Sequence, residues 1–104
     1  MVTELTTKLD KIFHERARLG IMSMLVAQDN ISFTELASKL DLTRGNLSVH
    51  MKVLEDNGYI TVTKEFIDKK PRTTYSATPE GRKAFTTYLE LLEKIIKGIQ
   101  DGTK

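Results

Sequence analysis

Cysteine is absent from this sequence of 104 residues, which excludes disulfides and thiolate chemistry. The sequence also lacks a glycine-rich phosphate loop, and its two histidines, His14 and His50, do not have the H-x-x-x-H or H-E-x-x-H spacing of a metal site. No apolar run approaches membrane-spanning length, and no basic cap with an apolar run follows Met1 as in a secretory signal. We therefore expect a cytoplasmic protein that is not an enzyme and uses no metal or cofactor.

Neither sign of charge is in large excess. The net charge is +2 and the pI is about 8.9, a balance that permits an acidic partner without requiring one. Hydrophobic residues make up 39% and charged residues 29%, which is ordinary for one globular domain, so we expect a single domain over residues 1–104. The core of so short a chain is small, and a partner subunit would add to it.

Residues 3–28 have the pattern of helices. Their apolar residues recur at helical spacing in two stripes, at Leu5, Leu9, Ile12 and Phe13 and at Leu19, Met22, Leu25 and Val26. The charged stretch "HERAR" separates the stripes, so this region is either one kinked helix or two.

Residues 33–58 have the signals of two helices joined by a short turn. Ser32 and Glu35 have the spacing of a capping box, so a helix should begin at residue 33. Thr43 is placed to cap a second helix, and Gly58 provides its left-handed C-terminal stop. Two short helices in this order predict a helix-turn-helix.

Residues 59–77 have the pattern of a β-hairpin. "YITVTKEF" is rich in β-branched residues and alternates, "IDKKPR" interrupts it, and "TTYSA" resumes as a second strand, with Thr73 and Thr74 in strand pairing. The interruption is basic, with Lys69, Lys70 and Arg72 around Pro71.

A last helix is predicted over residues 79–100, with Thr78 as its N-cap and Pro79 in its first turn. Its apolar residues follow three-four spacing, at Phe85, Tyr88, Leu89, Leu92, Ile95, Ile96 and Ile99. A small core can bury only the start of this stripe, so we expect a dimer interface in which it joins Leu5, Leu9, Ile12 and Phe13. The alternative is that the helix folds back and buries the stripe on its own domain.

The segments "RLGIMSML", "SFTELASKLDLTRGNLSVHMKVLEDNGYI" and "KKPRTTYSATPEGRKAF" occur in this order between Arg18 and Phe85. Together they closely resemble the small winged-helix transcriptional regulators of archaea and bacteria, relatives of the MarR and ArsR groups. The sequence departs from that pattern at Arg16, where the family usually has proline. The resemblance implies an α+β, mainly helical fold: a winged helix-turn-helix with a three-helix core, a β-hairpin wing and a C-terminal dimerisation helix.

The resemblance also implies that the helix after the turn is a recognition helix that enters the major groove. Thr43 and the helix N-terminus would then lie near a phosphate. Arg44 can bind guanine O6 and N7 or clamp a phosphate, and Gly45 lets the backbone approach closely. The other implied DNA contacts are Asn46 and Ser48 to bases or phosphates, Val49 to a thymine methyl, and Lys52 to the backbone, with Lys64, Lys69, Lys70 and Arg72 on the wing.

The function implied is that of a homodimeric, sequence-specific regulator that binds a near-palindromic operator in double-stranded DNA. The alternative is a winged helix used as a protein-interaction module in a transcription or assembly complex. Such a module should have an apolar or acidic recognition face, whereas this face is polar with basic ends. A small-molecule effector held between the DNA-binding and dimer parts is compatible with the sequence, which identifies no ligand.

Two histidines have structural as well as functional interpretations. His50 lies between the expected base-facing and core-facing positions, and we expect it to be packed or hydrogen-bonded rather than a ligand. Asp10 and His14, four residues apart, could form half of an interfacial metal site, but such pairs are usually surface hydrogen bonds or solvated charges. We therefore predict no metal site.

Overall fold

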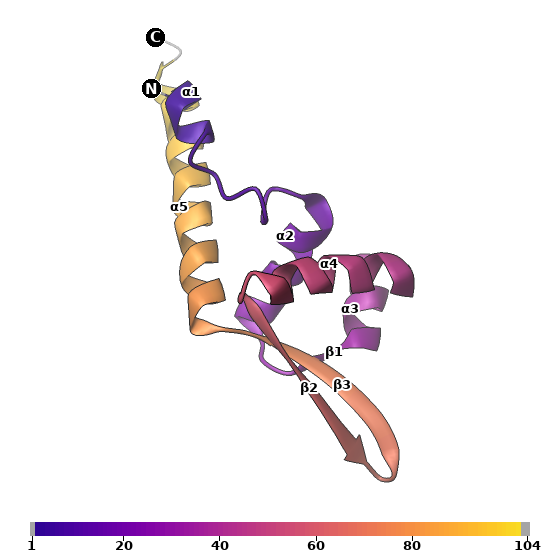
Figure 1. The fold of residues 1–104 in the computed structure, drawn as a ribbon. Helices are drawn as coiled ribbons and strands as arrows, with labels where there is room; N and C mark the ends of the chain where they lie inside the picture. The colour runs from indigo at the N-terminus through magenta and orange to yellow at the C-terminus, as the bar shows by residue number, and fades with distance from the viewer. Residues whose placement is uncertain (1, 103–104) are drawn as a thin grey trace.

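The computed structural model describes residues 2–102, and it has the winged-helix fold that the sequence predicts. Figure 1 shows a helical centre from which a β-hairpin and the far half of a long helix project in different directions. The elements are α1 (Val2–Thr6), α2 (Arg16–Ala27), β1 (Ile31–Ser32), α3 (Phe33–Leu40), α4 (Arg44–Asp56), β2 (Ile60–Ile67), β3 (Lys70–Ala77) and α5 (Pro79–Gly102). In these residues, no helix is both long and apolar enough to cross a membrane.

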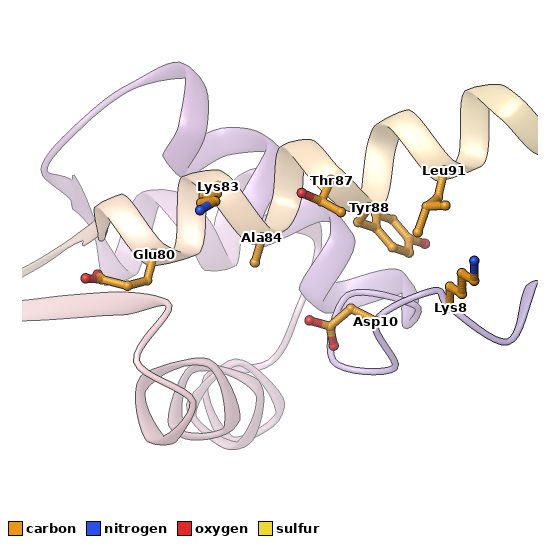
Figure 2. A pocket seen from close by; sticks show the side chains of 8 residues that line it. All are labelled: Lys8, Asp10, Glu80, Lys83, Ala84, Thr87, Tyr88 and Leu91. Carbon is orange, nitrogen blue, oxygen red and sulfur yellow. The ribbon is translucent and has the colours of Figure 1, made fainter. Parts of the chain in front are cut away.

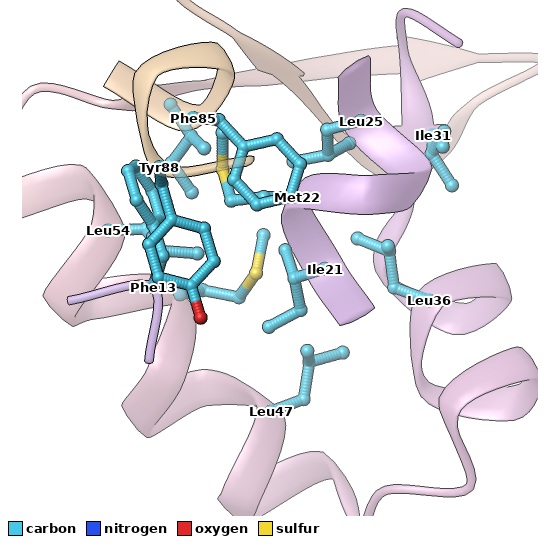
Figure 3. Close-up of a cluster of buried hydrophobic side chains, with 12 residues drawn as sticks. Phe13, Ile21, Met22, Leu25, Ile31, Leu36, Leu47, Leu54, Phe85 and Tyr88 are labelled. Carbon is cyan, nitrogen blue, oxygen red and sulfur yellow. The ribbon is translucent and has the colours of Figure 1, made fainter. Parts of the chain in front are cut away.

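The core lies where α2, α3, α4 and the start of α5 meet, as Figure 3 shows. Each helix contributes the residues that its helical spacing places on one face. The fully or almost fully buried side chains are Phe13, Ile21, Met22, Leu25, Ile31, Leu36, Leu47, Met51, Leu54, Ile60, Phe85 and Tyr88. This packing orients α4, because Leu47, Met51 and Leu54 fix which of its faces points to solvent.

Local capping determines where the helices of the helix-turn-helix begin and end. The Ser32 hydroxyl accepts a hydrogen bond from the Glu35 backbone N–H at 3.1 Å, and the Thr43 hydroxyl accepts one from the Asn46 N–H at 3.1 Å. Both predicted caps are thus confirmed. The chain leaves α4 through Gly58, whose φ of 75° is the left-handed conformation that glycine adopts without strain.

The N-terminal region contains two helices, which resolves the alternative left open by the sequence. Residues 7–15 form turns instead of continuing the helix. Polar side chains bond the backbone there: Asp10 Oδ1 accepts from the Ile12 N–H at 2.9 Å, and Glu15 Oε1 accepts from the Arg18 N–H at 2.9 Å. Within this turn Phe13 enters the core, with its ring centroid 4.8 Å from that of Tyr59.

The sheet is antiparallel with the order β1-β3-β2, and its hairpin is longer than the sequence predicts. Pairing runs from Ile60↔Ala77 to Ile67↔Lys70, so the turn contains only Asp68 and Lys69. These two residues have φ values of 53° and 64°, as a two-residue turn that follows the strand twist requires. The expected interruption over residues 67–72 is therefore wrong, and Pro71 lies within β3.

Helix α5 begins as predicted but continues to Gly102. The Thr78 hydroxyl accepts a hydrogen bond from the Gly81 N–H at 2.9 Å. A Cβ at Gly81 would collide with the carbonyl oxygen of Tyr59, so only glycine allows α5 to leave the hairpin at this close distance.

Part of the expected dimer interface lies inside the single chain. Phe13, Phe85 and Tyr88 are buried in the core, because Phe13 packs edge-on against the rings of both α5 aromatics. The expectation that they face a partner is wrong. Leu9, Ile12 and Leu92 are partly buried against the same core, whereas Leu89, Ile96 and Ile99 are exposed and Leu5 and Ile95 are half-buried.

Candidate nucleic-acid interface

Helix α4 exposes the polar and small residues that the sequence assigned to its outer face. With Leu47, Met51 and Leu54 in the core, the exposed set is Arg44, Gly45, Asn46, Ser48, Val49 and Lys52. Val49 is 62% exposed, although it is a β-branched apolar residue in a helix. The sequence and the packing therefore agree on which side of α4 is available to a partner.

The guanidinium of Arg44 is held in place by an aromatic ring. Its Cζ lies 4.7 Å from the centroid of Phe33, and the Phe33 centroid lies 6.2 Å from that of Tyr75. A cation over an aromatic face is attracted by the electron-rich ring while its N–H groups stay free to bind. Arg44 is exposed, so this contact orients a donor group at the N-terminal end of α4 without burying it.

The first turn of α4 remains accessible around Thr43 and Gly45. The Thr43 hydroxyl accepts the Asn46 N–H and retains its own proton for a further acceptor. No atom outside the local backbone lies within 4 Å of a Cβ built at Gly45. The fold of this chain therefore does not require glycine at position 45.

The far half of α4 is acidic as well as basic. Lys52 Nζ lies 3.0 Å from Asp56 Oδ1, one helical turn away, and the hydrogen bond and charge of that carboxylate raise the pKa of Lys52. An exposed pair of this kind contributes little to stability. Positive charge on α4 without a nearby carboxylate partner is thus concentrated at Arg44, near the wing.

A cleft of about 460 Å³ joins α4 to the wing. It brings together four of the predicted DNA-contact residues: Arg44 and Ser48 from α4, and Lys64 and Arg72 from the hairpin. A smaller hollow beside it is lined by Ser48 and Lys52 of α4 and by Val62 and Lys64 of β2, among others. Lys69 and Lys70 lie outside the cleft, at the exposed tip of the wing.

Three aromatic residues near this surface were not predicted as part of it. Phe33 and Tyr75 line the cleft, and Phe66 is exposed on β2. Burial raises the pKa of Tyr75, the charge of Glu55 adds to the increase, and Arg44 opposes it. Phe33 and Tyr75 meet Arg44 only through the tertiary fold, whereas the continuation of the β2 alternation past Lys64 was a signal for Phe66.

His50 contacts side chains of the N-terminal region, in line with a structural role. Arg18 Nη1 lies 3.0 Å from His50 Nδ1, and Glu15 Oε1 lies 3.6 Å from the same nitrogen. Arg18 Nε also donates to the Ile12 carbonyl at 2.7 Å. Burial acts to raise the pKa of Glu15, but the Arg18 backbone N–H and the nearby His50 and Arg18 side chains outweigh it, so this pKa is lowered.

Asp10 and His14 each contact a tyrosine of their own chain. The Tyr59 hydroxyl donates to Asp10 Oδ2 at 2.8 Å, and His14 Nδ1 lies 2.8 Å from the Tyr88 hydroxyl. Burial and then the hydrogen bond to Asp10 raise the pKa of Tyr59 to about 12. Within residues 2–102, no group of three or more metal-ligating side chains is placed to hold a metal ion.

A separate pocket of about 410 Å³ lies between the turns of residues 7–15 and α5, as Figure 2 shows. Its lining is mixed, because the Tyr88 ring and Leu91 give it apolar walls while Lys8 and Lys83 add cationic side chains. The full lining is Lys8, Asp10, Glu80, Lys83, Ala84, Thr87, Tyr88 and Leu91.

Comparison with known proteins identifies the family. Residues 17–96 match the model of the winged helix DNA-binding domain. The uncharacterized protein MJ0432 of Methanocaldococcus jannaschii is 34% identical over 90 residues, which cover 86% of this chain and 98% of that protein. The solved structure of a transcriptional regulator homologue from Pyrococcus horikoshii OT3 is also 34% identical, with a TM-score of 0.84 over 94% of this chain and 95% of that one.

A more distant structure has the same fold. A MarR-family transcriptional regulator from Enterococcus faecalis V583 has a TM-score of 0.75 at 22% identity, over 88% of this chain and 83% of that one. The two structural relatives are described as a homologue of a transcriptional regulator and as a regulator of the MarR family. On the match over residues 17–96 and the relative covered over 98% of its length, this chain belongs to the winged helix DNA-binding domain family.

Proposed function

We propose that this protein is a cytoplasmic, homodimeric transcription regulator that binds a specific sequence of double-stranded DNA. The observation that supports this most directly is the cleft in which Arg44 and Ser48 of α4 face Lys64 and Arg72 of the wing. A helix that enters the major groove beside such a hairpin places these cations along one phosphate backbone. The wing then lies on the flanking backbone or in the minor groove.

The residues of α4 divide by the DNA group that each can reach. Thr43 and the helix N-terminus suit a phosphate, because the free hydroxyl proton and the helix dipole both favour an anion. Arg44, oriented by Phe33, can bind guanine or clamp a phosphate. Gly45 permits close approach, and the remaining contacts are Asn46 and Ser48 to bases or phosphates, Val49 to a thymine methyl and Lys52 to the backbone.

The proposed dimer uses the part of the α5 stripe that the core leaves uncovered. Leu89, Ile96 and Ile99 are 44%, 53% and 54% exposed. Leu92 and Ile95 on the same helix are half-buried, as is Leu5 on α1, which contacts α5. Two copies joined through this surface place two α4 helices about a two-fold axis, which matches a near-palindromic operator.

The alternative function, a protein-interaction module, has less support. Its recognition surface should be apolar or acidic, yet α4 presents Arg44 and Ser48 to the cleft. The pocket between the turns of residues 7–15 and α5 supports an effector site between the DNA-binding and dimer parts. Small-molecule control is therefore an extension of the regulator proposal and not a competing one.

The proposal predicts that Arg44→Ala and Arg72→Ala each weaken operator binding by about 1–3 kcal/mol, because each removes a charge-assisted DNA contact. Both residues are exposed, so thermal unfolding midpoints should change little. Kd is measured by titration of labelled operator DNA. Lys94→Ala is the matched control, because this exposed lysine lies on α5, and unaltered affinity in both arginine variants would contradict their assignment.

Selection of genomic fragments that bind the protein identifies the operator. Sizing of the complex in solution then gives the number of chains bound to it. Enrichment of one near-palindromic motif that binds two chains would support the homodimeric regulator. Absence of any enriched motif would contradict sequence-specific DNA binding and favour the interaction module.

A further inference from the structure

Phe66 on the wing is exposed to an unusual degree for an aromatic residue. It is 78% exposed, the highest value among the large hydrophobic side chains of residues 2–102. A phenyl ring exposed to water lacks the stabilising free energy of burial that other aromatic residues of this chain have. Single exposed apolar residues are common, so its meaning depends on which way it faces and what surrounds it.

Strand geometry places Phe66 on the same face of the hairpin as the cleft. Side chains alternate along β2, and Val62 and Lys64 both line the hollow beside α4. Phe66 is two residues further along the strand, and its cross-strand partner Pro71 lines the cleft. At the rise of an extended strand, Phe66 lies about 7 Å beyond Lys64 towards the tip.

The surroundings of Phe66 fit an anionic partner that also has apolar surface. The same hairpin carries more cations than carboxylates. The cations are Lys64, Lys69, Lys70 and Arg72, and the carboxylates are Glu65 and Asp68. A duplex has this combination, because the minor groove is walled by the C–H faces of deoxyribose between rows of phosphates. The cations would meet the phosphates and the ring would meet the sugars.

We propose that Phe66 is an apolar DNA contact that packs against deoxyribose in the minor groove next to the major groove occupied by α4. This inference rests on the proposed function, which assigns only polar and basic side chains of the wing to DNA. Ile67 alternates to the opposite face and takes no part. The contact adds affinity that does not depend on released counterions, in contrast to that of the wing cations.

The test compares Phe66→Ala with Ile67→Ala and Lys64→Ala on the selected operator at several salt concentrations. Phe66→Ala should raise Kd about tenfold, as expected for loss of a buried aromatic side chain. The slope of log Kd against log salt should not change in Phe66→Ala, whereas Lys64→Ala should reduce it by about 1. Ile67→Ala should bind like the unaltered protein.

Hydroxyl-radical footprinting locates the contact, because the radical attacks deoxyribose in the minor groove. The unaltered protein should protect sugars that flank the α4 site, and Phe66→Ala should lose only that flanking protection. Equal Kd and equal flanking protection in Phe66→Ala would overturn the inference, as would an equal loss in Ile67→Ala, which would indicate general damage to the hairpin. If the unaltered protein selects no DNA motif, the proposed function fails instead, so the two failures are distinguishable.

Discussion

Gly45 is a residue of α4 that its own helix does not require. Glycine disfavours a helix relative to alanine, and the space around a Cβ at this position is empty. The φ of Gly45 is also not in the left-handed region. Among the described residues, Gly58 is the only glycine with a left-handed φ. The fold therefore does not explain glycine at position 45, and the proposed close approach of a DNA backbone does.

Gly45→Ala should accordingly separate stability from binding. We expect the free energy of unfolding to rise by about 0.5–1 kcal/mol, because alanine has the higher helix propensity. Operator affinity should fall, because the added methyl group keeps α4 away from the DNA. Urea unfolding and operator titration measure the two effects, and a variant that is more stable with unchanged affinity would show that the backbone does not approach closely here.

At this scale the sequence predicts local contacts well and distant contacts poorly. The caps at Ser32 and Thr43 could be predicted because donor and acceptor are three residues apart. The Arg44–Phe33 contact joins two helices, so its geometry depends on how α3 and α4 pack. Likewise, nothing local shows that Phe13 is in the core and not at a subunit interface.

Among the elements, α2 is tied to α4 through the Arg18–His50 contact and through the carboxylate that caps α2. Glu15 caps α2 through the Arg18 N–H and lies 3.6 Å from His50 of α4. The pKa of Glu15 is lowered from its ordinary value of 4.5, so ionised Glu15 stabilises the folded state. That contribution is complete above the ordinary pKa and is lost as the pH falls through the lower folded-state value.

Glu15→Gln should therefore be less stable than the unaltered protein at pH 7, and the difference should shrink as the pH falls below 4.5. The measurement is the urea midpoint of both proteins across pH 3 to 7, chosen to span the titration of carboxylates. A stability difference that stays constant over this range would exclude the carboxylate charge as its cause. Arg16→Gln, an exposed charge change next in sequence, is the control.

The elements themselves are predictable where periodicity is strong. The helices 33–40 and 44–56 and the start of α5 agree with their sequence signals. The sequence predicts too wide a hairpin turn because Pro71 lies among basic residues, whereas the left-handed Asp68 and Lys69 close the turn in two residues. Residues 7–15 do not form the helix that their apolar spacing indicates, because the side chains of Asp10 and Glu15 accept hydrogen bonds from backbone N–H groups there.

At the scale of the whole molecule, the proposed dimer depends on the exposed apolar stripe of α5. Ile96→Lys places a charge in the proposed interface, where its desolvation disfavours association. We expect this variant to be monomeric in solution and to bind the two-fold operator with lower affinity, while its thermal midpoint shows a folded chain. Light scattering and operator titration measure these effects.

Glu90→Lys is the matched control, because it introduces the same side chain at an exposed position on a different side of α5. The control should remain dimeric. A dimer in both variants, or a monomer for the unaltered protein, would contradict an interface on this stripe.

Helix α5 is continuous for 24 residues, from aromatic rings in the core to the exposed isoleucines. At 1.5 Å per residue this is a rigid rod of about 36 Å. In the proposed dimer, the crossing angle of two such rods sets the distance between the two recognition helices. The spacing of operator half-sites that the dimer can bind would then depend on contacts between the two α5 helices, at the end of the molecule farthest from the bases.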